Sequence, residues 1–379
     1  AIELNSMGMF GDMTGATVAV SGLNAQTGDL NILTGEWSNL VAGTTQTLAW
    51  EDFENIDPAF NDAKVAYAYT VDSVTANTVE VSVADLALTH ADGNNRAFSA
   101  TPAIFSYPVT PVNGSSHVLK LNLIESPIVT GTGTTEVQWA RSNLYYEAGH
   151  NPYRFYGNNV QTDATDGKGY FSFGGIIPRK FANNGDTQDP CSLVYPAGVW
   201  RQPTHTDFAP IVSTDGLLTN ILGSVLNVLT RNPAPDVTNP AAGAYIDYTA
   251  AVEKGAGNTA FGPESNTLRF PLNGQMNTIS VVPVIGADGL VVLNLNTPGL
   301  LGALVNTRGR DAALWTNEQG VDILGLVGLG SRAYLGGKRN AVLGAFMGAQ
   351  GTVEPLSDIS VLGINAVKST FKNVRCVRN

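Results

Sequence analysis

The chain is poor in charge, in long apolar runs and in cysteine, and each shortage argues against a class of protein. Asp, Glu, Lys and Arg make up only 14% of the 379 residues, and the net charge is −11. Nucleic acids and anionic membranes both attract clustered Lys and Arg, so neither is an expected partner. The most apolar stretch, residues 217–229, is too short to span a bilayer, and its helical spacing predicts a buried helix.

Motifs for catalysis, metal binding and cofactor binding are also missing from the sequence. The four histidines have no metal-ligand spacing, and no Gly-x-Ser-x-Gly sequence is present. Residues 328–333 lack the βαβ surroundings of a dinucleotide site, and residues 336–339 do not form a phosphate-binding loop. Asp163 and Asp166 match no EF-hand, so a solvated loop is favoured over a Ca²⁺ site. We therefore predict a non-enzymatic protein with no catalytic residue, metal or cofactor.

The only two cysteines are Cys191 and Cys376, which lie far apart in the sequence. A redox pair is usually close-spaced, and a metal site needs more ligands than His205 can add. A structural disulfide is favoured, with two buried free thiols or a catalytic thiol as the alternatives. A disulfide indicates an oxidising compartment. Residues 1–5 lack the basic start and apolar run of a secretory signal, so the protein either stays inside the cell or is the mature or engineered form of an exported precursor. The cysteine usage favours the exported form.

The first third of the chain has the pattern of an all-β sandwich, which we place at residues 1–130. Apolar and polar residues alternate at 79–84, 119–123 and 67–71, which predicts half-buried strands. Turns are expected at 27–29, 91–94 and 112–115. The edge of such a sandwich can accept a strand from another chain.

Residues 126–134 lack large polar and aromatic side chains, and we expect a linker there. The following region, 134–379, is predicted to be an α+β domain. Thr204 is expected to cap a short helix that ends at Phe208, and further strands are expected at 278–285, 290–295 and 341–345. Residues 232–266 are rich in Pro, Gly, Ala and Asn and predict surface loops.

Aromatic residues are dense between Trp139 and Phe173. Such a cluster is more often core than a platform for sugar rings, although stacking on carbohydrate is the alternative. Arg201, which follows Trp200, is expected to pair with a buried carboxylate or carbonyl group.

Several short sequences in the second region resemble, in the same order, those of a repeated surface-protein domain of Bacteroidetes and Fibrobacter. They are Trp139 to Tyr146, Asp189-Pro190-Cys191, Trp200-Arg201-Gln202-Pro203-Thr204, Leu268-Arg269-Phe270-Pro271 with Gly274, Leu314-Trp315-Thr316 and Val374-Arg375-Cys376-Val377-Arg378. The Trp-Arg-x-Pro-Thr and Arg-Cys-x-Arg sequences also resemble those of formylglycine-generating enzymes. This resemblance implies a C-type-lectin-like fold, closed by Cys191 and Cys376, in which Trp200, Arg201, Pro203, Thr204, Trp315 and Arg375 are structural.

The first third is similar to the N-terminal sandwich of fimbrillin-like proteins at residues 18–23 and 28–37. Together the two regions resemble a fimbrillin-family protein of Bacteroidales, and this implies a lipoprotein at the extracellular surface of a Gram-negative bacterium. The expected function is that of a pilus tip or accessory subunit in adhesion. Its expected partners are other pilus subunits, joined by strand addition, and a glycan or protein receptor. The alternatives are a carbohydrate-binding surface lipoprotein outside any pilus and an enzyme of the formylglycine-generating type.

Overall fold

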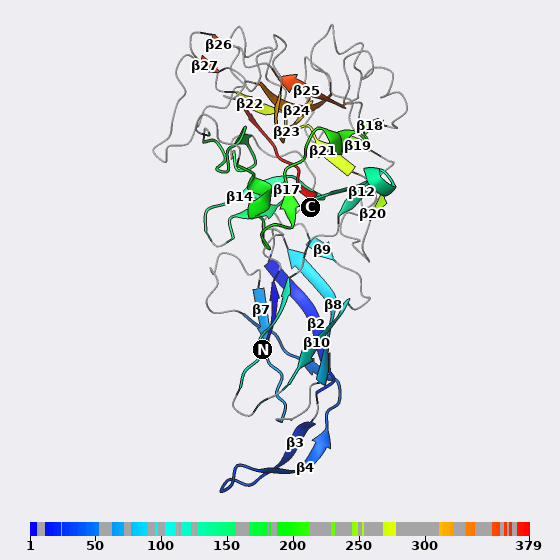
Figure 1. The fold of residues 1–379 in the computed structure, drawn as a ribbon, viewed down its shortest axis with the longest axis vertical. Coiled ribbons are helices and arrows are strands. Elements are labelled where there is room, and N and C mark those ends of the chain that lie inside the picture. Colours follow the sequence, from blue (N-terminus) through cyan, green and yellow to red (C-terminus); the bar gives the residue numbers. More distant parts are fainter. Residues whose placement is uncertain are drawn as a thin grey trace. The chain divides into compact units, whose positions relative to one another are not determined.

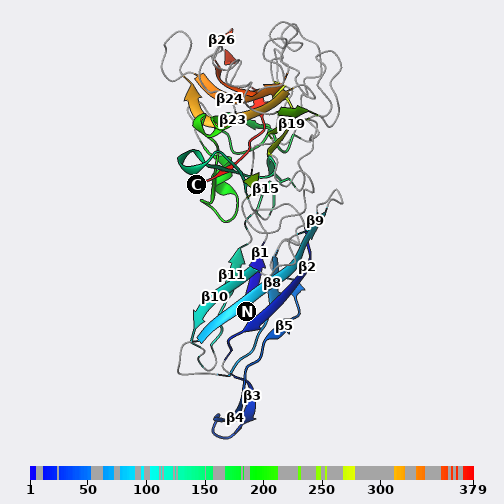
Figure 2. The ribbon, with the colours of Figure 1, turned by 90° about the vertical axis from the view of Figure 1, so that its right-hand side faces the viewer.

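The computed structural model describes a chain built from two compact units (Figures 1 and 2). One unit comprises Ala1–Ile124, and the other comprises Glu125–Lys254 together with Pro263–Asn379. The residues described are 1–5, 12–23, 25–52, 63–71, 77–89, 95–97, 103–110, 112, 115–122, 124, 127–149, 151–156, 167–180, 182, 188–211, 229–231, 245–248, 252–253, 268–277, 311–320, 330–337, 351–356, 360–361, 364–365 and 370–379.

The first unit contains two sheets whose apolar faces share one core, as in a β-sandwich. The first sheet has the order β11-β1-β7-β6, and the second has the order β10-β8-β2-β5 with β9 paired to β8. Val18 and Val20 of β2 pair with Val83 and Val81 of β8, and all four side chains are buried. The strands are β1 (Ile2–Asn5), β2 (Asp12–Ser21), β5 (Gln46–Leu48), β6 (Glu51–Asp52), β7 (Ala63–Ala66), β8 (Asn77–Thr89), β9 (Asn95–Ala97), β10 (Ala103–Val109) and β11 (Leu119–Asn122).

A separate two-stranded hairpin belongs to the first unit and consists of β3 (Ala25–Leu30) and β4 (Trp37–Ala42). The predicted turn at 27–29 is wrong, because Thr27, Gly28 and Asp29 lie within β3. The chain reverses instead at residues 31–36, where Asn31 N–H donates to Glu36 O at 2.9 Å and Gly35 N–H donates to Asn31 O at 2.7 Å.

The alternating patterns gave strands at two of the three predicted places. Residues 79–84 lie in β8, with Val79, Val81 and Val83 buried, and residues 119–122 form β11. The third prediction is wrong, because β7 ends at Ala66 and residues 67–71 lie outside any strand. The turn at 112–115 has its expected hydrogen bond from Ser115 N–H to Val112 O, and the one at 91–94 lies outside the described residues.

The second unit is built around a five-stranded sheet with the order β17-β29-β13-β12-β20. Its strands are β12 (Ile128–Thr130), β13 (Val137–Trp139), β17 (Trp200–Arg201), β20 (Val252–Glu253) and β29 (Val377–Arg378). The chain end thus pairs with segments far away in the sequence, since β29 lies between β13 and β17. Residues 128–130 are buried strand, so the linker predicted at 126–134 is wrong for these three residues.

Smaller sheets complete the described part of the second unit. They have the orders β14-β15, β16-β28-β22, β18-β19-β21, β23-β24-β25 and β26-β27. Their strands are β14 (Leu144–Tyr146), β15 (Tyr153–Phe155), β16 (Phe171–Ser172), β18 (Leu229–Arg231), β19 (Tyr245–Tyr248), β21 (Leu268–Pro271), β22 (Gln275–Asn277), β23 (Asp311–Gly320), β24 (Gly330–Gly337), β25 (Gly351–Leu356), β26 (Ser360–Val361), β27 (Ile364–Asn365) and β28 (Thr370–Lys372).

The α+β character expected for the second unit is not seen among the residues described. The helices there are three short 3₁₀ helices, η1 (Gly133–Thr135), η2 (Pro190–Leu193) and η3 (Thr206–Phe208). The helix predicted at 217–229 lies outside the described residues up to 228, and Leu229 begins β18. The strands predicted at 278–285, 290–295 and 341–345 and the loop carrying Asp163 and Asp166 also lie outside them. The chain described is therefore mostly β.

Candidate functional site

Cys191 and Cys376 form the predicted disulfide, with the two sulfur atoms 2.08 Å apart. Cys191 lies in η2 and Cys376 directly precedes β29, at a sequence separation of 185. Both side chains are fully buried among Phe155, Trp200 and other apolar residues. The link therefore ties the chain end to the segment that leads into β17.

Arg375 connects its own motif, residues 374–378, to the motifs at residues 139–146 and 268–271 in the interior of the second unit. Its Nε–H donates to Asn143 Oδ1 at 2.9 Å, and its guanidinium also donates to the backbone oxygens of Ala140 and Arg269 at 3.0 and 2.8 Å. The side chain is fully buried, and its charged end lies 5.3 Å from the centre of the Phe270 ring. Arg375 thus holds segments together rather than facing a ligand.

Trp315 and Trp200 each anchor the same core from another strand. Trp315 of β23 donates its indole N–H to Phe171 O at 2.9 Å, and its ring packs edge-on against Phe173. Trp200 of β17 packs edge-on against Phe155. Both tryptophans are buried in the core of the second unit.

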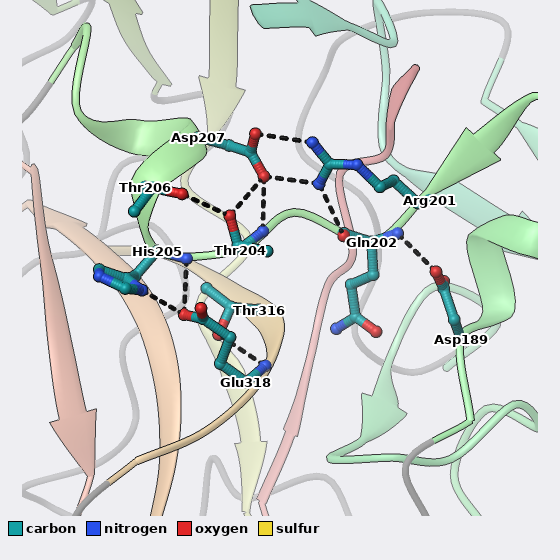
Figure 3. A network of polar contacts seen from close by, with 9 residues as sticks. All are labelled: Asp189, Arg201, Gln202, Thr204, His205, Thr206, Asp207, Thr316 and Glu318. Atoms are coloured by element: carbon teal, nitrogen blue, oxygen red, sulfur yellow. Dashed lines mark hydrogen bonds and ion pairs between the residues drawn. The ribbon is translucent and has the colours of Figure 1, made fainter. Parts of the chain in front are cut away.

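Arg201 pairs with a buried carboxylate, as the sequence predicted (Figure 3). Its two terminal nitrogens lie 2.6 and 2.8 Å from the oxygens of Asp207, a two-pronged contact that fixes the guanidinium plane. Asp189 accepts from the backbone N–H groups of Cys191 and Gln202, both at 2.8 Å. These contacts connect the disulfide segment, β17 and η3.

Thr204 does not cap the short helix as expected. The helix η3 starts at Thr206 with His205 at its N-cap, and no side chain caps it. Asp207 instead accepts from the backbone N–H and the hydroxyl of Thr204, at 2.6 and 2.8 Å (Figure 3). Because the carboxylate also binds Arg201, one side chain fixes the loop from both ends.

A second contact ties this loop to β23. Glu318 accepts from the backbone N–H of His205 at 2.8 Å and also contacts Nδ1 of the same residue (Figure 3). Pro203 is buried, and its carbonyl oxygen accepts from Asn317 N–H at 2.9 Å. The loop is therefore held on two sides by neighbouring chain segments.

Folding shifts the pKa values of Asp207 and Asp189 in opposite directions. Burial alone would raise the pKa of Asp207, but the hydrogen bonds from Arg201 and Thr204 outweigh it and lower that pKa. For Asp189, burial prevails over its backbone hydrogen bonds and raises the pKa.

Among the described residues, no group of three or more His, Cys, Asp or Glu is placed to hold a metal ion. The arrangement is that of a structural clamp.

The aromatic residues between Trp139 and Phe173 are core, which confirms the favoured interpretation. Trp139 donates its indole N–H to Thr130 Oγ1 at 2.8 Å and packs against Phe208 with ring centres 4.9 Å apart. The other described members are likewise buried, with Tyr146 partly so: Tyr145, Tyr153, Phe155, Tyr156, Tyr170, Phe171 and Phe173. This cluster offers no platform for sugar rings.

The first unit contains a hollow that sequence patterns did not reveal, the apolar groove, with a cavity volume of about 350 Å³. Its walls come from the ends of strands in both sheets, including Leu119 of β11 and Val109 of β10. Its lining is Ala1, Ile2, Val20, Leu23, Trp37, Tyr67, Ala68, Tyr69, Thr70, Val71, Val79, Val109, Val112, Ser115, Ser116, His117 and Leu119.

The rim of the apolar groove exposes large apolar and aromatic side chains. Tyr69 is 78% exposed and Val112 is 57% exposed. The lining residues include no Asp, Glu, Lys or Arg, and His117 is the one imidazole among them. The groove therefore suits an apolar occupant. Its only signal in the sequence was the alternating segment 67–71, which predicted a strand and instead forms part of the wall.

No family model matches the chain, and neither a curated protein nor a solved structure is significantly similar to it. Among the residues described, no helix has the length and apolar character needed to cross a membrane.

Proposed function

We propose that this chain is a non-enzymatic surface protein of a Gram-negative bacterium, a pilus tip or accessory subunit that mediates adhesion. The observation that carries the proposal is the apolar groove of the first unit, which is open at its rim and lined almost entirely by uncharged side chains. A groove of this kind is suited to the apolar side chains of a partner's strand.

The position of the groove favours strand addition by a partner subunit. β10 and β11 each form one edge of their sheet in the described part of the unit, and both contribute to the groove wall. A strand that pairs with such an edge gains backbone hydrogen bonds, and every second side chain of that strand would enter the groove. Residues 67–71 line the groove, with Tyr67 and Tyr69 exposed and Val71 buried.

The second unit supplies the receptor contact in this proposal. Its sequence motifs resemble a lectin-like surface domain, and a disulfide closes its scaffold. The disulfide also supports a non-enzymatic role over formylglycine-type chemistry, which needs free thiols, because both cysteines of the chain are bonded. The receptor would be a glycan or a protein.

Binding of strand peptides tests the role of the groove. A panel of ten-residue peptides with alternating apolar side chains is titrated onto the purified chain and followed by fluorescence anisotropy. Val112→Arg places a charge in the groove, and we expect it to weaken binding by about tenfold or more. Val118→Arg is the matched control, because Val118 is 50% exposed and does not line the groove.

Two outcomes would count against this function. No peptide of the panel binds, or Val112→Arg and Val118→Arg bind every peptide equally well. Either result would leave the groove without the role in assembly that the proposal gives it.

A carbohydrate-binding surface lipoprotein is the second candidate, and exposed tyrosines at the groove favour it. Tyr67 and Tyr69 are 48% and 78% exposed, so their ring faces are accessible to a sugar. A glycan array probed with the chain and with Tyr69→Ala tests it. Binding that depends on Tyr69 supports this candidate, and an array without signal removes it.

A further inference from the structure

The hairpin of β3 and β4 is a small body of its own within the first unit (Figures 1 and 2). In the described part of the chain, its two strands pair only with each other, and the hydrogen bonds of the side chains at 27–41 stay within the hairpin. Asp29, for example, accepts from Asn39 Nδ2–H at 2.7 Å. The hairpin is therefore free to move as one piece without breaking a hydrogen bond of the sandwich residues described.

The chain enters and leaves this hairpin through a glycine. Gly22 follows β2 with a φ of +79°, and a Cβ there would lie 2.1 Å from Thr78 O. Gly43 follows β4, and a Cβ there would lie 2.2 Å from Leu23 O. Hinges are formed by a few residues at the ends of elements, and glycine has the widest backbone freedom of any residue. The two glycines are thus positioned to act as hinges at the base of the hairpin.

One side chain of the hairpin reaches the apolar groove. Trp37, the first residue of β4, lines the groove and is 39% exposed. Because Trp37 directly follows the turn, the tip end of the hairpin is the part that touches the groove. In the turn itself, Ile32 is 87% exposed and Leu33 is 92% exposed. Exposed apolar groups of this size mark an interaction site, and an isolated two-stranded hairpin gains stability from packing.

We infer that the hairpin is a flap that closes over a strand bound in the apolar groove, with Trp37 as its positioning residue. The inference rests on the proposed function, because it needs a strand in the groove. A bound strand brings apolar side chains up to the rim, where Tyr69 and Val112 are exposed. Closure then places Trp37 against the strand and brings Ile32 and Leu33 over the rim, so apolar surface on both sides leaves water.

A flap acts on the release of a strand more than on its capture. While the hairpin is open, a strand reaches the groove without any movement of the protein. Once the hairpin has closed, it must reopen before the strand leaves, and this step slows dissociation. A fixed wall has no such step, so the two rate constants distinguish a flap from a wall.

Stopped-flow fluorescence with a labelled ten-residue strand peptide measures both rate constants on the full chain. We expect Trp37→Ala to raise the dissociation rate constant by about tenfold or more and to change the association rate constant by less than about threefold. Trp37→Phe should restore slow dissociation, because it keeps an aromatic ring. Leu40→Ala is the matched control, since Leu40 is 50% exposed on the same strand and does not line the groove. Circular dichroism of each variant checks that its fold is intact.

The distance between two spin labels reports the movement itself. Both native cysteines are bonded to each other and buried, so introduced cysteines supply the only free thiols. Thr34→Cys places one label on the turn, and Val118→Cys places the other directly before β11, outside the groove lining. We expect peptide binding to shorten this distance and to narrow its distribution. The pair Ile104→Cys and Val118→Cys reports on the sandwich alone and should not change.

Two results would overturn the flap and leave the proposed function intact. The peptide binds while the distance from residue 34 to residue 118 stays the same, or Trp37→Ala and Leu40→Ala release the peptide equally fast. A Trp37→Ala variant that binds more slowly but releases the peptide at the wild-type rate would also overturn it, because Trp37 would then be a fixed wall. Failure of every peptide to bind the wild-type chain overturns the proposed function, and the flap with it.

Discussion

Replacing Cys191 and Cys376 together by alanine removes the covalent link while adding no polar group to the buried site. The disulfide closes a loop of 185 residues. In the chain-entropy account, a loop of that length restricts the unfolded chain enough to stabilise the fold by about 5 kcal/mol, which is an upper value. For a unit of this size, such a loss lowers the midpoint of thermal unfolding by roughly 10–20 °C.

Tryptophan fluorescence reports this transition directly, because Trp139, Trp200 and Trp315 are buried in the same unit. Urea unfolding of the wild-type chain and of the Cys191→Ala and Cys376→Ala double variant gives the difference in stability. A strong reductant should lower the stability of the wild-type chain and leave the stability of the double variant unchanged. A double variant within about 1 kcal/mol of wild type would refute the entropic argument.

Two further predictions concern the second unit. Asp207→Asn should lower stability at pH 7 by about 1–3 kcal/mol, because it leaves the half-buried guanidinium of Arg201 without its anionic partner. The pKa of Asp207 is lowered by folding, so its contribution is present above the ordinary carboxyl pKa and is lost as the pH falls through the folded pKa. The urea midpoints of wild type and variant should therefore converge at acid pH, and a constant gap would contradict this. Trp139→Ala should lower stability by about 3–5 kcal/mol through the cavity it creates, whereas a change below about 1 kcal/mol would show that the site is not core.

Features that depend on local pattern or on one strong chemical constraint could be predicted from the sequence. Val79, Val81 and Val83 alternate with polar neighbours, and one face of β8 is buried as the pattern requires. The only two cysteines bond to each other. Arg201 finds the buried carboxylate of Asp207, because a guanidinium next to a buried tryptophan needs a partner.

Features set by tertiary context could not be predicted in the same way. Thr27, Gly28 and Asp29 have turn propensity, but they pair with β4 through irregular register and remain in β3. Residues 67–71 have the alternation of a strand, but both tyrosines face outward at the apolar groove. The groove forms where the ends of several strands come together, and the alternation of residues along the sequence does not predict that arrangement.

Hydrogen exchange of the full chain with and without a bound strand peptide tests the central claim most directly. If the groove receives a partner strand, the exchange of the amides of residues 67–71, 115–117 and 119 should slow on binding, because these residues line the site. Amides of β23 in the second unit should be unchanged. Protection confined to the second unit, or no protection at the groove under saturating peptide, would contradict the account.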